Sequence, residues 1–277
     1  ENGGGILIGS STSETKFTLS SSGFYKCQSS KGDSFYSETN SLQFENCWID
    51  QSANSAFYAK ERNSLTFNQI IISNSKLFST ADTGVNNFKI SHLNLSSNRE
   101  TFSIISSGVD CEFCDISFNT GNTLFDLTVS QEFALDYANI YQNNFQESIF
   151  KSQKGNSLLS QCYFLNDLSK LYLTATSFAK IWQSSFDQSE AQVKSKCPRA
   201  YLADNTYNST QTTLITYDNF DICWDKMPRT KAPMKISTST ILQIAAIAGL
   251  ALVVLFLFCK LCGNRGYNTK VPLLYTA

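Results

Sequence analysis

The sequence Phe44-Glu-Asn-Cys47-Trp-Ile49 carries the pattern that decides the fold, because similar units return about every 22 residues along the chain. Each unit pairs a mostly apolar residue at position i with an apolar or small residue at i+3. The aligned units are Phe24–Cys27, Phe44–Cys47, Phe67–Ile70, Phe88–Ser91, Cys111–Cys114, Leu135–Ala138, Leu159–Cys162, Trp182–Ser185 and Ala203–Thr206. A fixed period of about 20 to 50 residues indicates repeats that stack on one another.

The spacing within a unit predicts how the chain bends. In a flat strand, side chains at i and i+3 point to opposite faces. If a corner of two residues separates two strands, both side chains can face one interior, and i+5 then follows i+3 by the strand period of two. Three short strands and their corners need about 22 residues, which is the geometry of a parallel β-helix with coils about 4.8 Å apart. The i+5 column is Ile49, Ile72, Leu93, Ile116, Ile140 and Phe164.

Composition supports an all-β fold. The chain has 277 residues, of which 42% are hydrophobic, and only four are prolines. Three prolines lie beyond the repeats, which agrees with the low tolerance of central strands for proline. A leucine-rich solenoid has a similar period, but its L-x-x-L-x-L-x-x-N frame is missing, and a β-sandwich is the second fold to consider. We therefore predict a parallel β-helix solenoid of about nine coils, roughly 43 Å long at the coil spacing.

Residues 241–259 read ILQIAAIAGLALVVLFLFC, which contains no charge and one polar side chain. A helix of this length is about 28 Å long and matches the hydrocarbon core of a bilayer. We therefore predict a single transmembrane α-helix at 241–259 after the solenoid. The remaining parts are residues 1–14, a truncated segment or partial coil; 15–223, the β-helix ectodomain; 224–240, a juxtamembrane stalk; and 260–277, a cytoplasmic tail.

Two features favour an extracytoplasmic ectodomain and a type I orientation in the plasma membrane or another surface membrane. N-glycosylation sequons begin at Asn94 and Asn208, and seven cysteines precede the span. Basic residues flank the span on both sides, so charge alone does not choose, and a tail-anchored cytosolic protein is the alternative. Cys259 and Cys262 flank the inner boundary and are candidate palmitoylation sites.

The charge distribution argues against a nucleic-acid partner. The chain has 22 basic and 23 acidic residues, of which seven and one follow Cys223, so 15 basic and 22 acidic residues precede it. The ectodomain is therefore acidic and lacks the basic surface that nucleic acids require. We expect the membrane and an extracellular glycan or protein as partners.

The units of the type F-x-x-C-x-[IL], their spacing and the terminal single span resemble the pectin-lyase-like right-handed β-helix ectodomains of single-pass surface proteins in protists, including polymorphic-membrane-protein-like ones. The resemblance covers about residues 15–223 and the membrane segment. It implies an extracellular scaffold with a right-handed coil, in line with the general crossover rule. It carries over no catalytic residue.

Four cysteines suggest disulfides. Cys27 and Cys47 fall in one column of adjacent aligned coils, where a disulfide and stacked reduced thiols both fit. Cys197 and Cys223 lie near the end of the solenoid, where a disulfide could staple the last coil. The number of cysteines before the span is odd, so at least one cannot pair within this part of the chain.

Catalysis is the main alternative to binding, because many β-helix proteins cleave acidic polysaccharides. The best acidic cluster is Asp110, Glu112, Asp115 and Asp136. Glu112 and Asp136 are about one coil apart, so they could stack on the exterior, with Lys89 one coil before. Such a cluster could serve a calcium-dependent polysaccharide lyase or a glycoside hydrolase. A solvated acidic surface is the favoured interpretation, and we expect no intrinsic catalysis, cofactor or metal.

Binding is favoured by two aromatic residues. Trp48 lies between Cys47 and Ile49, and Tyr163 lies between two residues assigned to the interior, so strand alternation points both rings outward. Exposed aromatic rings on a flat face can stack on sugars or dock a protein. We therefore predict a scaffold for adhesion or recognition with a binding face that includes Trp48 and Tyr163.

Overall fold

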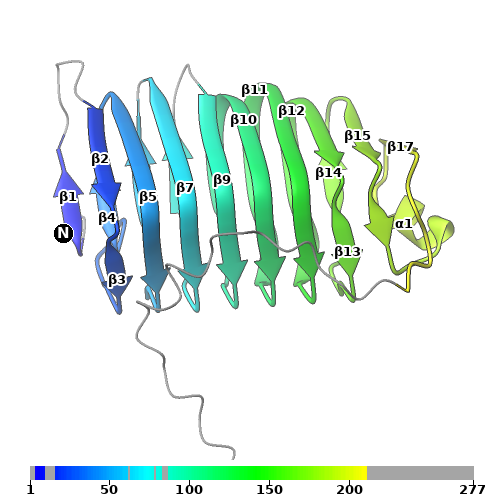
Figure 1. The fold of residues 1–277 in the computed structure, drawn as a ribbon, viewed down its shortest axis with the longest axis horizontal. Coiled ribbons are helices and arrows are strands. Elements are labelled where there is room, and N and C mark those ends of the chain that lie inside the picture. Colours follow the sequence, from blue (N-terminus) through cyan, green and yellow to red (C-terminus); the bar gives the residue numbers. More distant parts are fainter. Residues whose placement is uncertain (1–3, 10–15, 62, 78, 83–86, 211–277) are drawn as a thin grey trace, which may run out of the picture. The chain divides into compact units, whose positions relative to one another are not determined.

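The computed structural model describes residues 4–9, 16–61, 63–77, 79–82 and 87–210. They form a parallel β-solenoid of about 8 turns with about 23 residues per turn (Figure 1). The predicted all-β solenoid is confirmed, with one turn fewer and a slightly longer period than expected. The stalk, the transmembrane helix and the tail predicted at 224–277 lie outside the described residues. Within the described ranges, no helix is long and apolar enough to cross a membrane.

The strands form three rows, which we call the first, second and third row. The first row consists of β2 (Lys16–Ser20), β15 (Ala179–Trp182), β17 (Ala200–Ala203) and parts of β5 (Ser41–Asp50), β7 (Ser64–Ser73), β9 (Asn87–Ser96), β10 (Phe102–Ser117), β11 (Thr120–Tyr141) and β12 (Asn144–Ser160). The second row continues β5, β7, β9, β10 and β11 past a corner and adds β3 (Gly23–Tyr25), β13 (Tyr163–Leu165) and β16 (Ser185–Phe186). The third row has β1 (Ile6–Ile8), β4 (Phe35–Ser37), β6 (Phe57–Lys60), β8 (Ser79–Asp82), β14 (Leu173–Ala175) and the remaining parts of β10, β11 and β12. Neighbouring coils pair in parallel along each row.

One residue in the left-handed region makes the corner between the first and second rows. Asn46 has φ 52°, and it turns the chain so that Phe44 and Cys47 both point inward and are buried. The same conformation returns at every coil, with φ between 50° and 57°, at Ser21, Asn46, Gln69, His92, Phe113, Tyr137, Gln161, Gln183 and Asp204. This corner explains why the sequence repeats at i and i+3, a spacing that a flat strand would not bury.

The observed register corrects the alignment at the fourth unit. Ile90, and not Phe88, pairs with Phe67, so the unit begins two residues later than expected. Leu93 therefore pairs with Ile70 in the i+3 column and leaves the i+5 column, where it had been placed. Phe88 and Ile90 are both buried, because residues two apart share a face of a strand, and the inward pattern alone did not distinguish them.

The last two units are each shifted by one residue. Ile181 pairs with Leu159, and Leu202 pairs with Ile181, so these residues continue the buried column. Trp182 and Ala203, which the alignment assigned to that column, lie on the outer side of their strands. The correction matters for function because it moves a large aromatic ring from the core to the surface.

Stacked rings and a ladder of polar side chains hold the coils together. Phe125 and Phe150 stack in parallel planes with 5.3 Å between ring centres. At the corner after the second row, the backbone N–H of Asn98 donates to Asn119 Oδ1 at 2.9 Å, and the N–H of Asn119 donates to Asn143 Oδ1 at 3.1 Å. All three asparagines are buried, so each amide satisfies a backbone group that water cannot reach.

The helix α1 (Glu190–Lys196) interrupts the last described coil (Figure 1). Its Val193 side chain is buried in the core. Lys196 Nζ donates to the carbonyl of Asp167 at 3.0 Å and lies 4.6 Å from the ring centre of Tyr172. This helix therefore covers core residues near the end of the solenoid that would otherwise meet solvent.

Candidate functional site

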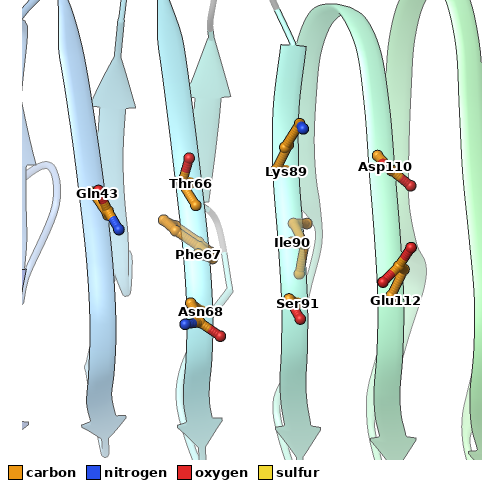
Figure 2. Close-up of a pocket in the computed structure, with 9 residues that line it drawn as sticks. All are labelled: Gln43, Thr66, Phe67, Asn68, Lys89, Ile90, Ser91, Asp110 and Glu112. Carbon is orange, nitrogen blue, oxygen red and sulfur yellow. The ribbon is translucent and has the colours of Figure 1, made fainter.

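The outer side of the first row carries a groove of about 340 Å³. Figure 2 shows the lining residues on β5, β7, β9 and β10: Gln43, Thr66, Phe67, Asn68, Lys89, Ile90, Ser91, Asp110 and Glu112. Successive side chains of a strand alternate, so Phe67 and Ile90 belong to the core and the polar residues beside them project outward. The groove is therefore lined by polar side chains, and the strands that carry them turn their apolar side chains into the core.

The polar groups of the groove are placed by the strand register. Lys89 is paired with Thr66 on one side and with Asp110 on the other, and Glu112 is paired with Ser91. Adjacent coils are about 4.8 Å apart, so the groove offers ammonium, hydroxyl, amide and carboxylate groups at a regular spacing. This arrangement can hydrogen-bond an extended ligand that has both donors and acceptors.

The structure divides the predicted acidic cluster between two faces. Glu112 and Asp136 pair in register on the first row, as predicted, and Asp110 lies on the same face. Asp115 instead follows the corner and faces outward on the second row, where it accepts a hydrogen bond from Asn139 Nδ2 at 2.7 Å. Burial raises the pKa of the Asp115 carboxyl, and the hydrogen bond from Asn139 partly opposes that shift. Asp115 therefore does not belong to the groove.

The carboxylates of the first row do not form a ready metal site. In the part of the chain that the structure describes, no group of three or more His, Cys, Asp or Glu side chains is placed to hold a metal ion. The hydroxyl of Ser160 donates to Asp136 Oδ1, so one member of the Glu112–Asp136 pair already has a partner on the next coil.

A ladder of rings borders the groove at the corner. His92 stacks on Phe113 with 4.9 Å between ring centres, and Phe113 stacks on Tyr137 at 5.3 Å. His92 Nδ1 lies 2.9 Å from the hydroxyl of Ser91. Burial lowers the pKa of the His92 imidazole, which the nearby Glu112 carboxylate partly offsets. Because the facing sides of the three rings contact one another, the ladder stiffens the corner.

The two predicted binding aromatics lie on the second row, across the corner from the groove. Trp48 is on the outer side as expected, but its ring packs over Gly23 of the neighbouring coil, where a Cβ would come within 2.2 Å of it. The ring of Trp48 is therefore half-buried. Tyr163 is also half-buried and pairs with Asn139 and Ser185. Neither ring lies beside the groove.

The two predicted glycosylation sites differ in accessibility. Asn94 is only 9% exposed, on the outer side of the second row. Asn208 is exposed near the end of the described residues. A glycan attached through the side-chain nitrogen can be accommodated by the folded coil at Asn208 and would meet a packed surface at Asn94.

The column predicted to hold both Cys27 and Cys47 is wrong. Phe24 pairs with Ile49 and not with Phe44, so Cys27 lies beyond the coil position that faces Cys47. The two cysteines are therefore not stacked in one column. Within the described residues the structure contains no disulfide.

The second predicted pair cannot be compared directly. Cys197 carries a buried thiol, and burial raises its pKa to about 12. Its proposed partner, Cys223, lies outside the described residues, as do Cys259 and Cys262.

Sequence reasoning named Lys89, Asp110 and Glu112 but missed Gln43 and Asn68, because a groove depends on which outward residues are neighbours across coils. The alternation of polar residues along each strand was visible, but it does not distinguish a groove from any other solvent-exposed surface.

No known protein family, curated protein or solved structure matches the chain.

Proposed function

We propose that this chain is a single-pass surface protein whose solenoid presents the outer face of the first row for adhesion or recognition of an extracellular glycan or protein. The observation that supports this proposal most directly is the groove, in which polar groups of several kinds line one flat face. The 19-residue apolar segment at 241–259 supports the membrane anchor. A type I orientation places the groove outside the cell.

The scaffold suits recognition because strand pairing and the buried core make the outer face of the groove rigid. Each outward side chain of the groove stands on a strand that is paired with two neighbouring coils and rests on a buried ladder. Groups positioned in this way lose little conformational entropy when a ligand binds. An extended ligand could follow the face across many coils at about 4.8 Å each.

The binding proposal is tested with the 277-residue chain in mild detergent, immobilised and probed with a glycan array and with cells in an adhesion assay. Lys89→Met removes the ammonium group at the centre of the groove. A hydrogen bond to a charged group contributes about 1.5–3 kcal/mol, so we expect the affinity to fall by about tenfold or more. Lys60→Met, on the third row, is the matched control and should leave binding unchanged. Equal binding by both variants would contradict the proposal that the groove holds the ligand.

The calcium-dependent lyase or glycoside hydrolase is tested on the same protein. Polysaccharides of several kinds are incubated with and without calcium, and new reducing ends or unsaturated products are measured. We expect none. Turnover that disappears in a variant carrying Glu112→Ala and Asp136→Ala would replace the recognition proposal by catalysis on the first-row face.

The orientation is tested by modification of the chain. Expression in a glycosylating host should give a glycan that Asn208→Gln removes and Asn94→Gln does not. External protease should digest the ectodomain of intact cells, and full protection would contradict a type I orientation.

Acylation of the tail is tested by labelling with a palmitate analogue. If the wild type and a double variant, Cys259→Ser with Cys262→Ser, are labelled equally, the tail cysteines are not acylated.

A further inference from the structure

Three aromatic side chains lie on the outer side of the first row, several coils beyond the groove. They are Phe178, which immediately precedes β15, Trp182, which ends β15, and Tyr201 on β17. We call these three residues the aromatic patch. Phe178 is 54% exposed and Tyr201 is 60% exposed, whereas most phenylalanines of the described coils are buried in the core. Exposed aromatic side chains gathered on one face are typical of an interaction site.

The register places a lysine among the rings. Lys180 is paired with Tyr201 across the coils, and its Nζ lies 4.4 Å from the ring centre of Trp182. Trp182 is flanked in its column by the small residues Ser160 and Ala203. The patch therefore combines ring surfaces, a positioned ammonium donor and small neighbours that leave room around the indole.

We propose that the aromatic patch is a sugar-stacking subsite that continues the groove, and that the ligand is an uncharged oligosaccharide lying along the solenoid. This inference rests on the proposed function and specifies its ligand. A sugar ring has an apolar C–H face, which packs on aromatic rings, and hydroxyl groups at its edge, which can accept a hydrogen bond from Lys180. In the corner ladder, by contrast, His92 and Tyr137 both stack on Phe113, so the middle ring is already covered.

The residues between the two places form a continuous path. In one outward column, Asp110 is followed on successive coils by Ala134, Leu158 and Lys180. Three coil steps correspond to about 14 Å, so an oligosaccharide of several sugar units can reach from the groove to the patch. Ala134 and Leu158 carry no charge and place no large polar group in the way.

The charges along this path favour an uncharged ligand. The groove end carries one cation, Lys89, and the carboxylates Asp110 and Glu112, with Asp136 on the next coil, so its net charge is negative and would repel a polyuronate. The patch end carries Lys180, which would repel a cationic polymer. A neutral glycan avoids both repulsions and can use the charged groups as hydrogen-bond partners.

The size of the patch favours a sugar over a protein. Each aromatic side chain can bury about 150–250 Å², and a little more than half of that is open at Phe178 and Tyr201, which amounts to about 170–290 Å² with little added by the half-buried Trp182. A stable protein interface needs about 800 Å² on each partner. The aromatic patch is too small for that but is large enough for one or two sugar rings.

The test uses the 277-residue chain in mild detergent and four probes: cellohexaose, mannohexaose, chitohexaose and hexagalacturonate. Binding is measured by isothermal titration calorimetry. We expect at least one neutral hexasaccharide to bind, and we expect Tyr201→Ala and Phe178→Ala each to weaken it by about tenfold. Tyr201→Phe keeps the ring and should retain most of the affinity. Leu168→Ala is the control, because Leu168 is 72% exposed but lies off the first-row face.

The outcomes separate this inference from the proposed function. Neutral binding that falls in Lys89→Met but not in Tyr201→Ala or Phe178→Ala overturns the sugar-stacking subsite and leaves the groove proposal standing. Binding of hexagalacturonate alone overturns the assignment of an uncharged ligand. If no hexasaccharide binds, or if Tyr201→Ala and Phe178→Ala impair only a protein ligand, the sugar assignment is overturned. Equal unfolding midpoints of the variants ensure that a loss of binding is not a loss of folding.

Discussion

Substitution of Asn119 by alanine should destabilise the solenoid through one buried corner. The Asn119 side chain accepts the backbone N–H of Asn98 at 2.9 Å and donates to the carbonyl of Leu95 at 2.8 Å and to Asn143 Oδ1 at 3.1 Å. Asn119→Ala removes all three hydrogen bonds. Asn143 Oδ1 still accepts the backbone N–H of residue 119, so the main uncompensated group is the buried N–H of Asn98.

The magnitude follows from these contacts. A buried donor left without an acceptor costs about 1–3 kcal/mol, and each other lost hydrogen bond contributes a net of about 0.5–1.5 kcal/mol. We therefore expect Asn119→Ala to lower the free energy of unfolding by about 3 kcal/mol. For a folded unit of this size that corresponds to a fall of about 6–12 °C in the unfolding midpoint. Asn119→Ser should lose less, because Ser75 Oγ accepts the N–H of Ser52 at 3.1 Å in an equivalent place.

The assay is urea and thermal unfolding followed by far-ultraviolet circular dichroism in one detergent. Asn122→Ala is the matched control: Asn122 is exposed and donates to Glu147 Oε2 at 2.9 Å, so its loss should cost less than about 0.5 kcal/mol. If Asn119→Ala and Asn122→Ala unfold at the same midpoint, the buried asparagine ladder contributes no more to stability than an exposed hydrogen bond.

Three further predictions concern packing, pH and thiol chemistry. Gly23→Ala should displace the Trp48 ring, change the tryptophan emission spectrum and lower the free energy of unfolding by about 1–3 kcal/mol. Gly9→Ala is the control and should change neither, because a Cβ at Gly9 meets nothing within 4 Å. If the emission spectra of Gly23→Ala and the wild type are the same, the contact between Gly23 and Trp48 is refuted. Burial raises the pKa of Glu61, so its folded form holds a proton that the unfolded chain releases, and stability should fall as the pH rises from about 4 through the folded pKa. Between pH 4 and 7, the unfolding midpoint of Glu61→Gln should fall less steeply with pH than that of the wild type. The same slope in both proteins would contradict a raised pKa at Glu61. Iodoacetamide should label Cys27 of the native protein before the buried cysteines, and equal labelling rates in peptide mass spectra would count against their burial.

The sequence was sufficient for the architecture and insufficient for the register. The apolar residues at i, i+3 and i+5 predicted a corner between two strands, and Asn46 forms that corner between Phe44 and Cys47. Any shift that keeps an inward residue inward is compatible with the same pattern, and this is why Phe88 was aligned where Ile90 belongs.

The candidate site was less accessible to sequence reasoning than the core. Glu112 and Asp136 were correctly expected to stack, because their separation equals one coil. Asp115 was expected beside them but faces another direction, since the corner at Phe113 lies between Glu112 and Asp115. Trp48 was correctly expected to point outward, but only the neighbouring coil shows that the ring packs down over Gly23.

The sequence alone determined that coils stack, because water excludes a periodic set of apolar side chains wherever the chain can bring them together. The tertiary structure alone decided which surface residues become neighbours. Lys89 meets Asp110, and Lys180 meets Tyr201, only through a register that depends on the length of every intervening coil. A shift of one or two residues rearranges the outer surface at little cost to the inward pattern, so the surface carries information that the repeat does not.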